Sequence, residues 1–433
     1  MNDTNAVLDT ELAGPPRLLL LLPSSTYRAS AFVDAVRRLD VLLTVASDRA
    51  SALAAHQPSG LLTLDFGDPG RAAEQARTFA SEFPVAAVFG VDDDTALVAA
   101  AVAAELNLPG VPVNATRAAR DKQLQRRILA ECGLPVPGFT AHDIAEPAEI
   151  VAQSALYPCV IKPVALSASR GVMRADSPEE FVRMHTRLAR ILAAPDVQSR
   201  RGSSRCAGEQ RYLVERFIPG PEVALEGLLV NGQLHVLALF DKPDPMDGPF
   251  FEETIYVTPS RLPASTQQEI SECVQRAAKA ICLDRGPVHA ELRVNDDGVW
   301  IIELAARPIG GRCSAALRFG EAGAISLEEV LLGHALGRVP PVPAREKCAS
   351  GVMMIPTPAA GVLREVRSVE EARRVTGVTE VVITAHIGQR LVPLPEGSRY
   401  LGFIFARGQT PAKVETALRR AHEALVITID GDC

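Results

Sequence analysis

The sequence predicts a mixed α/β and α+β protein that begins with an N-terminal parallel α/β layer. Short apolar runs alternate with Ala-rich helical patterns over residues 17–113, as in parallel sheets whose strands are joined by crossover helices. After about residue 115 the apolar runs are joined by tight turns such as Asn231-Gly232, which favour antiparallel hairpins. From about residue 340, after a Pro-rich segment, further strands and one helix predict a C-terminal α+β part.

The N-terminal layer is expected to contain four strands, buried on both faces, and three helices. The turn after the first strand lacks a GxGxxG pattern, so no dinucleotide site is predicted. The expected strands are Leu18–Leu22, Val41–Ala46, Leu61–Leu64 and Val85–Gly90, and the expected helices lie near 29–39, 71–82 and 95–106.

Three consecutive aspartates, Asp92 to Asp94, follow the fourth expected strand. They lie at the carboxyl edge of the sheet, where sheets of this type bind ligands. The alternative is structural, because Asp94 or Thr95 would make a good N-cap for the next helix. The sequence favours the cap over the ligand site.

The middle and last parts of the chain alternate strands with a few helices. Residues 198–210 are polar and rich in Gly and Ser, which predicts a surface insertion. The expected elements, in order, are a helix at Ala118–Cys132, strands near Phe139 and at Cys159–Pro163, a loop at Ala165–Gly171, a strand from Val172, a helix at Glu179–Leu192, strands at Tyr212–Phe217, Val223–Val230, Leu234–Phe240, Val352–Ile355, Glu380–Thr384 and Tyr400–Ala406, a helix at 411–424 and a strand at 425–429.

The composition indicates an ordinary soluble protein. Hydrophobic residues make up 47% of the 433 residues, and the net charge is −7, which argues against a nucleic-acid or anionic-membrane partner. The eight cysteines are scattered without a CxxC pair, as expected of reduced, mostly buried thiols. The only dense apolar run near the N-terminus is too short to span a bilayer, and the segment before it is acidic. A cytoplasmic location is therefore expected.

The segment His289–Gly311 contains the most informative pattern of the chain. Asp296, Asp297 and Gly298 would form a three-residue hairpin loop, in which the glycine takes a positive φ. This register pairs Asn295 with Val299, Arg293 with Ile301, and Glu291 with Glu303. A two-residue loop would instead put the glutamates on opposite faces, because side chains alternate along a strand.

Glu291 and Glu303 would then lie face to face, with His289 on the same face. Two carboxylates at this separation repel each other. The pair is tolerated when a divalent cation lies between them or when one carboxyl group keeps its proton. The pattern favours the cation, and so predicts an Mg²⁺ site. His289 is equally compatible with a core histidine that is hydrogen-bonded to its neighbours.

A second pattern indicates phosphate binding. Lys162 ends an apolar strand and is followed by Ser167, Ser169, Arg170 and Gly171. Small residues let backbone N–H groups approach an anion closely. Taken alone, this loop is explained at least as well by an ordinary surface turn as by phosphate binding.

Several further residues are candidates for a nucleotide or substrate site. Lys122 lies on a basic helix and would ordinarily be a solvated lysine. Arg307 would hold an anionic intermediate, or else pair with a nearby acid. The remaining candidates are Glu215, Phe217 and Ile218 for adenine, Glu222 for ribose and Lys242 for phosphate.

The order and spacing of these motifs resemble the ATP-grasp superfamily over about residues 17–340. The resemblance is greatest to carboxylate–amine ligases of the L-amino-acid (dipeptide) ligase type. It implies a two-subdomain ATP-grasp fold after the parallel layer, with a C-terminal α+β lid. The implied domains are 1–114 (N-terminal α/β), 115–340 (ATP-grasp) and 341–433 (C-terminal).

The resemblance also implies roles for the candidate residues. Lys122 and Lys162 would bind ATP phosphates under a lid formed by Ser167–Gly171. Glu291 and Glu303 would coordinate Mg²⁺, for which Mn²⁺ is an acceptable substitute. Arg307 would steady an acyl phosphate, with Lys242 as a second catalytic cation. By analogy, Glu252 and Glu253 would bind a substrate ammonium group, and His289 would lie at the substrate site. Glu215, Phe217, Ile218 and Glu222 would bind adenine and ribose as stated above. Many members carry Asn two residues after the second metal glutamate, where this chain has Ala305, which puts the second metal position in doubt.

The implied reaction joins a carboxylate, activated by ATP as an acyl phosphate, to an amine, with ADP and phosphate as products. The resemblance implies a small-molecule carboxylate and a small-molecule amine as substrates, the amine being an amino acid, and a homodimer is compatible with it. Two alternatives stay open: a ligase or carboxylase of nucleotide biosynthesis, and a catalytically silent ATP-binding regulator.

Overall fold

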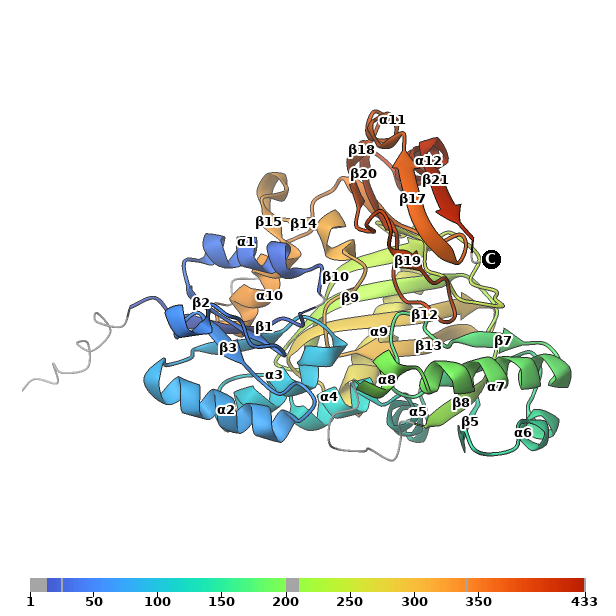
Figure 1. Cartoon of the computed structure of the whole chain (residues 1–433), viewed down its shortest axis with the longest axis horizontal. Coiled ribbons are helices and arrows are strands. Elements are labelled where there is room, and N and C mark those ends of the chain that lie inside the picture. Colours follow the sequence, from blue (N-terminus) through green and yellow to red (C-terminus); the bar gives the residue numbers. More distant parts are fainter. Residues whose placement is uncertain (1–13, 25, 200–209, 339–341, 432–433) are drawn as a thin grey trace, which may run out of the picture. The chain divides into compact units, whose positions relative to one another are not determined.

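The computed structural model describes residues 14–24, 26–199, 210–338 and 342–431. Most of the predicted polar insertion, residues 200–209, lies outside the described residues. The chain divides into two compact units, whose elements are drawn in Figure 1. One unit is formed within Met1–Gly110 and Glu328–Pro341, the other within Val111–Leu327 and Val342–Cys433. The three-domain division expected from the resemblance stays a prediction.

The first unit contains the predicted parallel sheet, in the strand order β3-β2-β1-β4. β1 and β4 are almost wholly buried, but β2 and β3 are only partly so. The expectation that all four strands are buried on both faces was therefore wrong for β2 and β3: of their residues, Ala46 belongs to the buried core that β1 and β4 form with the helices, whereas Leu42 is exposed. The bounds are β1 Arg17–Leu21, β2 Leu42–Ser47, β3 Leu61–Thr63 and β4 Ala87–Gly90.

The helices of this unit follow the predicted order, with one addition. Asp92 caps the third helix, and Thr95 returns the bond to complete a capping box. The predicted cap is thus present, although Asp92 is the N-cap residue. A helix from much later in the chain joins this unit, where Glu329 forms an ion pair with Arg38 at 3.0 Å. The bounds are α1 Ala29–Leu39, a 3₁₀ turn at Ala54–His56, α2 Pro69–Glu82, α3 Asp93–Glu105 and α10 Leu327–Ala335.

The second unit contains a small antiparallel sheet, in the order β5-β8-β6-β7. Phe181, Leu188 and Leu192 from one amphipathic helix pack with the apolar residues of this sheet. The bounds are β5 Phe139–Asp143, β6 Cys159–Pro163, β7 Met173–Ala175 and β8 Arg211–Arg216, with helices α6 Ala148–Ser154, α7 Pro178–Leu192 and α8 Pro195–Ser199.

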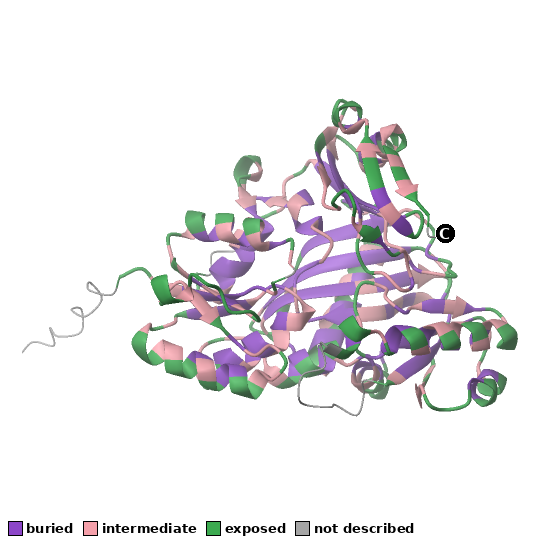
Figure 2. Ribbon diagram, viewed as in Figure 1, coloured by how far each residue is buried: buried purple, intermediate pink, exposed green. Residues whose placement is uncertain are grey.

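A large eight-stranded sheet forms the centre of the second unit, in the order β13-β12-β9-β10-β11-β16-β20-β18. Figure 2 shows that its strands carry much of the buried surface of this unit. β11 pairs with β16, so the sheet continues into the C-terminal segment. The bounds are β9 Glu222–Val230, β10 Gln233–Lys242, β11 Ile255–Thr258, β12 Gly286–Asn295, β13 Gly298–Ala305, β16 Ala349–Ile355, β18 Val378–Ile383 and β20 Gly402–Gly408.

Three helices pack against the β9–β12–β13 end of this sheet, and their apolar residues share one core with it. The single helix predicted at Ala118–Cys132 is in fact two helices. Asp121 is extended, and its carboxylate accepts a hydrogen bond from Leu124 N at 2.9 Å, so that it caps a new helix. The bounds are α4 Val113–Arg120, α5 Lys122–Glu131 and α9 Ala264–Ala280.

The C-terminal segment adds two helices and a three-stranded sheet in the order β19-β17-β21. Its apolar residues form one core with β11, β16, β18 and β20. A two-stranded ribbon, β14 and β15, precedes it. The bounds are β14 Arg318–Phe319, β15 Ile325–Ser326, β17 Gly361–Arg367, α11 Val369–Arg373, β19 Arg390–Leu391, α12 Pro411–Ala424 and β21 Val426–Asp430.

Two general expectations can be compared with the described residues. None of the helices described there has the length and hydropathy required to cross a membrane. Six cysteines are described and all are free thiols. Three of them are buried, so the expectation of mostly buried thiols holds for half of those described; Cys206 and Cys433 lie outside the described residues.

Candidate functional site

The turn between β12 and β13 differs from the predicted three-residue loop. Asn295 pairs directly with Gly298, so the loop contains two residues. Asn295 Oδ1 accepts a hydrogen bond from Asp297 N at 3.0 Å, and Gly298 has a φ of +115°, which glycine tolerates without strain. This register alone would put Glu291 and Glu303 on opposite faces.

A β-bulge restores the predicted glutamate pair. The register shifts between Glu291 and Leu292, so that β13 has one additional residue at this point. Beyond the bulge, Glu291 lies directly opposite Glu303. Each later residue of the bulged strand moves by one place. The prediction that the two glutamates share one face is confirmed. The predicted three-residue loop was wrong, and the bulge, not the loop, brings the two glutamates to the same face.

Each of these two glutamates has a lysine ammonium group beside it. Lys122 Nζ lies 3.3 Å from Glu303 Oε1, and Lys242 Nζ lies 3.4 Å from Glu291 Oε1. Burial by itself would raise the pKa of Glu291, but Lys242 and His289 outweigh it and lower that pKa to about 2. Glu291 is therefore ionised at neutral pH, as a carboxylate ligand of a divalent cation must be.

A second acidic group lies next to this pair. Glu222, Glu253 and Glu291 offer oxygens within 4.8 Å of one another. Lys242 Nζ already lies among them, 2.7 Å from Glu222 and 2.6 Å from Glu253. A divalent cation in this triad would have to compete with a buried ammonium group. Glu291 and Glu303 also have ammonium groups beside them, but at the longer distances of 3.4 and 3.3 Å, so their carboxylate oxygens are the better candidates for Mg²⁺.

The ammonium group of Lys242 is the centre of a buried charge cluster. Its burial opposes the charge, but Glu222, Glu253 and Glu291 together raise the pKa of Lys242 well above its usual value. Burial and Glu291 raise the pKa of Glu253 against the pull of Lys242. Tyr256 donates a hydrogen bond to Glu253 at 2.7 Å. Lys242 is thus a permanent cation at neutral pH.

Lys162 is held by a partner that the sequence assigned to another role. Lys162 Nζ lies 2.7 Å from Glu215 Oε2, and Arg126 Nε lies 2.7 Å from Glu215 Oε1. All three side chains are buried. Burial, aided by Arg126 and opposed by Glu215, lowers the pKa of Lys162 to about 8. Any contact of Glu215 with adenine therefore falls to its backbone, because both carboxylate oxygens hold cations.

The loop between β6 and β7 has an unusual backbone. Ala168, Ser169 and Gly171 all have positive φ values, between 54° and 76°. Consecutive non-glycine residues in this region are strained, and such strain is found mostly at functional sites. Lys122 Nζ donates a hydrogen bond to Leu166 O at 2.9 Å. The loop is thereby tied to a lysine that also faces Glu303.

Two residues of this loop, Arg170 and Gly171, contact residues that are distant in the sequence. Arg170 forms a two-pronged ion pair with Asp196 of α8. Gly171 N donates to Pro395 O at 2.9 Å, and the next residue, Glu396, forms a bidentate pair with Arg187 of α7 at 2.9 and 2.8 Å. The C-terminal segment therefore holds the loop in its present position.

A fully buried glutamate supports His289 and the turn after β13. The carboxylate of Glu226 accepts hydrogen bonds from Ile309 N at 3.2 and 3.1 Å, and it lies 3.3 Å from His289 Nδ1. His289 Nε2 lies 3.6 Å from Glu291 Oε1. Glu226 and Glu291 raise the pKa of His289 against its burial. Glu226 thus fixes the segment that carries Arg307, two residues before Ile309.

We expect Glu226→Ala to lower the free energy of unfolding by about 1–3 kcal/mol, because the buried Ile309 N–H loses its acceptor. Glu226→Gln retains a carbonyl oxygen for that N–H and should lose less. Urea unfolding of the two variants gives both values. Equal losses would show that Glu226 acts through its charge and not as an acceptor for Ile309.

The predicted adenine residues belong to a small apolar cluster. Phe217 packs with Met246 and Phe251. Arg293 covers the Phe217 ring with its guanidinium 5.0 Å from the ring centre, and it donates to Ile218 O at 2.7 Å. Arg293 also pairs with Glu222 at 2.9 Å. Glu222 therefore already has two cationic partners, and a ribose hydroxyl would have to share the Glu222 carboxylate with them.

The two glutamates predicted to bind a substrate ammonium group have different surroundings in the structure. Glu253 joins the Lys242 cluster, whereas its neighbour Glu252 makes no contact with that cluster among the described interactions. Burial is the main cause that raises the pKa of Glu252. Of these two glutamates, Glu253 is the one that lies beside another predicted site residue, Lys242.

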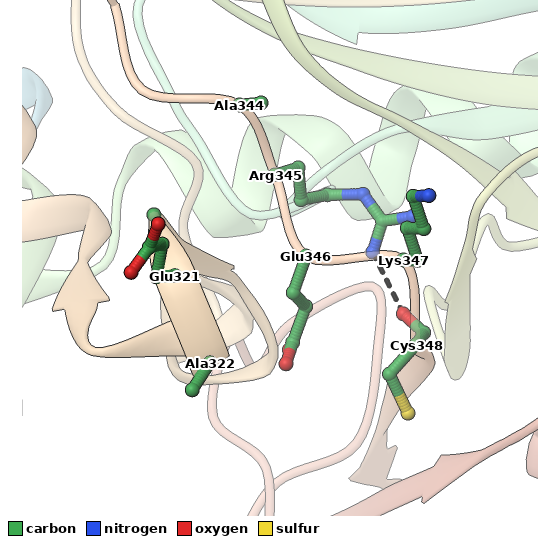
Figure 3. A pocket seen from close by; sticks show the side chains of 8 residues that line it. Glu321, Ala322, Ala344, Arg345, Glu346, Lys347 and Cys348 are labelled. Atoms are coloured by element: carbon green, nitrogen blue, oxygen red, sulfur yellow. Dashed lines mark hydrogen bonds between the residues drawn. The ribbon is translucent and has the colours of Figure 1, made fainter.

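A cavity of about 590 Å³ lies elsewhere in the second unit. It is lined by residues 320–322 and 344–348, and it includes none of the predicted site residues. Figure 3 shows Arg345 and Cys348 on its wall, joined by a hydrogen bond of 3.0 Å from Arg345 Nη1 to the Cys348 carbonyl.

Four residues of the site were not predicted from the sequence. Arg126, Glu226, Tyr256 and Arg293 each contact a predicted site residue. Arg293 and Glu226 could have been found from strand alternation, since Arg293 lies two residues after Glu291 and Glu226 four residues after Glu222. Arg126 had no comparable signal, because its partner Glu215 is 89 residues away.

Comparison with known families gives matches along most of the chain. An ATP-grasp domain model matches residues 155–316, and an ATP-grasp N-terminal domain model matches residues 33–110. Residues 353–430 match domain 2 of the L-amino acid ligase C-terminal region. The chain is an ATP-grasp protein of the L-amino acid ligase type. Enzymes of this type are ligases that form carbon–nitrogen bonds.

Individual relatives agree with this assignment. An L-amino acid ligase from Bacillus licheniformis, of known structure, is 26% identical, with a TM-score of 0.80, over 96% of this chain and 99% of its own. A D-alanine–D-alanine ligase from Desulforudis audaxviator is 29% identical over 48% of this chain; the match spans 66% of that relative. The biotin carboxylase domain of Hydrogenobacter thermophilus 2-oxoglutarate carboxylase, solved with magnesium ADP, has the same fold at 16% identity, covering 96% of this chain and 91% of its own, with a TM-score of 0.65.

Proposed function

We propose that this ligase joins two amino acids through an amide bond, with ATP converted to ADP and phosphate. The observation that carries the proposal is the Glu291–Glu303 pair with Lys122 and Lys242 beside it. The match to an L-amino acid ligase C-terminal domain favours amino acids over a ribosyl-amine or bicarbonate. A silent regulator would not require this set of acids and cations. The reduced thiols suit a cytoplasmic location.

A carboxylate is a poor electrophile, because its oxygen is a poor leaving group. Attack of a carboxylate oxygen on the γ-phosphorus of ATP releases ADP and gives an acyl phosphate. The amine of the second substrate then attacks the acyl carbon, phosphate leaves, and the nitrogen loses a proton. A bound Mg²⁺, held by Glu291 and Glu303, would offset charge on the β- and γ-phosphates.

The residues of this chain would position the reactants and neutralise charge. Lys122 and Lys162 would bind phosphate oxygens, and Phe217 and Ile218 would face the adenine ring. Arg307, anchored through the Ile309–Glu226 bond, would steady the charge that develops on the acyl phosphate. Glu253 would bind a substrate ammonium group.

The test is phosphate release from ATP in the presence of Mg²⁺, measured with panels of amino-acid pairs, bicarbonate and ribosyl-amines. We expect one or more amino-acid pairs to stimulate release, with a dipeptide as the product. Stimulation by bicarbonate or a ribosyl-amine alone would replace the proposal with a carboxylase or a ligase of nucleotide biosynthesis. Tight ATP binding without stimulation by any panel member would indicate a regulator.

We expect the loop Ala165–Gly171 to close over bound nucleotide, because an acyl phosphate is labile in water and must be shielded from it. Trypsin cleavage after Arg170 should therefore slow when ATP and Mg²⁺ are added. Cleavage after Arg49, which is exposed in the first unit, serves as the control and should not change. Equal cleavage after Arg170 with and without nucleotide would contradict a closing lid.

A further inference from the structure

The strap is the loop of residues 392–400, which follows β19 and leads to β20. The residues at its two ends, Leu391 and Leu401, lie in the apolar core of the C-terminal segment. Leu391 pairs with Gly361 of β17, and Leu401 N donates a hydrogen bond to Ile355 O of β16 at 3.0 Å. The strap is therefore held at both ends by the C-terminal sheets.

The middle of the strap is a tight turn. Gly397 N donates a hydrogen bond to Pro393 O at 2.8 Å. A Cβ atom on Gly397 would lie only 1.7 Å from Val392 O, so the turn requires glycine at this position. Pro395 and Glu396 lie between the two hydrogen-bonded residues and form the tip of the turn.

The tip of the strap contacts the last residue of the loop Ala165–Gly171, which was predicted to close over nucleotide. Gly171 N donates a hydrogen bond to Pro395 O at 2.9 Å. A Cβ atom on Gly171 would lie 3.1 Å from Leu188 of α7 and 3.3 Å from Pro163 of β6. Gly171 is thus packed against β6, α7 and the strap.

A second contact joins the strap to α7, the helix behind this loop. Glu396 accepts two hydrogen bonds from Arg187, at 2.9 and 2.8 Å, an arrangement that fixes the orientation of both side chains. The guanidinium of Arg187 also lies 4.8 Å from the centre of the Phe250 ring. Phe250 forms a β-bridge with Met173, two residues after Gly171. The ion pair therefore supports the same end of the loop as the Pro395 contact.

The other end of the loop is bound to the candidate active site. Lys122 Nζ donates a hydrogen bond to Leu166 O at 2.9 Å and lies 3.3 Å from Glu303 Oε1. One end of the loop thus lies on a predicted phosphate-binding lysine, and the other end lies on the strap. A loop held at both ends has few other positions, so a change at the strap should alter how well it covers the site.

We propose that the strap positions the loop Ala165–Gly171 over bound ATP, with Glu396 as the positioning residue. This inference rests on the proposed function and gives the C-terminal segment a part in it. Glu396 would touch neither ATP nor amino acid, and would act through Arg187 and the backbone of the strap. A well-covered site excludes water from the acyl phosphate, and a loop covers a site reliably only when residues around it fix its position.

The first experiment compares Glu396→Gln with wild type in phosphate release and dipeptide formation. The KM for ATP should rise by on the order of 3–10-fold, as for the loss of one two-pronged ion pair that is partly exposed. More phosphate should be released per dipeptide, because water reaches the acyl phosphate. Glu371→Gln, at an exposed glutamate of the same segment, is the control and should change neither value. A lower midpoint of thermal unfolding with both values unchanged would overturn the proposal, because Glu396 would then only stabilise the fold.

The second experiment tests whether Glu396 acts through Arg187. Arg187→Gln should raise the KM for ATP at least as much as Glu396→Gln, because it also loses the contact with Phe250. Adding Glu396→Gln to Arg187→Gln should then raise the KM by less than about twofold more, as for two residues that share one interaction. Fully additive effects of the two substitutions would overturn the role of this pair.

The third experiment needs no amino-acid substrate, so it separates this proposal from the proposed function. If no amino-acid pair stimulates phosphate release, the proposed function fails, but ATP binding and trypsin cleavage of the full chain still report on the strap. Glu396→Gln should raise the Kd for ATP with Mg²⁺, measured by calorimetry, by the same factor as the KM, and should speed cleavage after Arg170 relative to cleavage after Arg49. An unchanged Kd together with unchanged cleavage would overturn the proposal.

Discussion

Replacing Glu303 with glutamine is expected to lower ATP-dependent turnover by on the order of 10²–10³-fold, the usual loss for one positioned charge contact in such a site. The amide has the shape of the carboxylate but no charge to bind Mg²⁺ or to pair with Lys122 at 3.3 Å. The fold should be kept, because the β12–β13 ladder at this residue depends on backbone pairing with Glu291.

Two measurements separate a metal role from a structural role. The Mg²⁺ concentration that gives half-maximal phosphate release should rise in Glu303→Gln, whereas the midpoint of thermal unfolding should stay near that of wild type. Asp297→Asn, an exposed acid at the tip of the same hairpin, should change neither. Turnover close to wild type in Glu303→Gln would remove Glu303 from the metal site.

The glutamate pair was predicted correctly because two departures from the predicted structure compensate each other: the loop is one residue shorter, and a bulge adds one residue to β13. The alternation of side chains and a tight turn were enough to place Glu291 opposite Glu303. The turn length was wrong, and a bulge beside Glu291 corrected it. A bulge changes the register without any change in the apolar pattern, because only one residue is left unpaired. The pairing of Glu291 with Glu303 was therefore predicted correctly, although the loop length from which it was predicted was wrong.

The elements were predicted best where a pattern is local. The four strands of the parallel layer and α12 have strong apolar periodicity, and they were found to within a few residues. The division of α4 from α5 was missed, because Asp121 is compatible with the interior of a helix as well as with its cap. The helix α9 and the ribbon of β14 and β15 were not predicted.

Residues that act through distant partners could not be found from local patterns. Arg126 and Glu215 are 89 residues apart, and Glu226 and Ile309 are 83 apart. Each pair is formed only when separate elements pack together. The sequence showed which residue types the site needed, but the buried partners that orient them became visible only with the tertiary structure.

Lys242→Met is expected to destabilise the fold strongly. Lys242 lies within 3.4 Å of Glu222, Glu253 and Glu291, and its loss leaves buried carboxylates without their shared cation. Removal of one partner from a buried ion pair commonly costs about 3–5 kcal/mol. Arg293 still pairs with Glu222, so Glu253 and Glu291 should carry most of the loss. Lys279→Met, at an exposed lysine, is the control.

The dependence of this loss on pH distinguishes charge from packing. In wild type the pKa of Lys242 is higher in the folded chain than in the unfolded chain. Its stabilising effect is therefore fully present below the ordinary lysine pKa and is lost only as the pH rises toward the folded value. In Lys242→Met the uncompensated carboxylates acquire a raised pKa in the folded chain, so the folded chain binds more protons and the loss should shrink as the pH falls.

A second substitution tests the same explanation at constant pH. Glu253→Gln removes one of the uncompensated charges, so the double variant Lys242→Met/Glu253→Gln should unfold at a higher urea concentration than Lys242→Met alone. The gain must exceed any effect of Glu253→Gln in the wild-type background, since a coupling of this sign arises only if the two residues interact. Strictly additive losses, independent of pH, would mean that Lys242 stabilises the sheet by packing against Tyr256 and not by neutralising the acids.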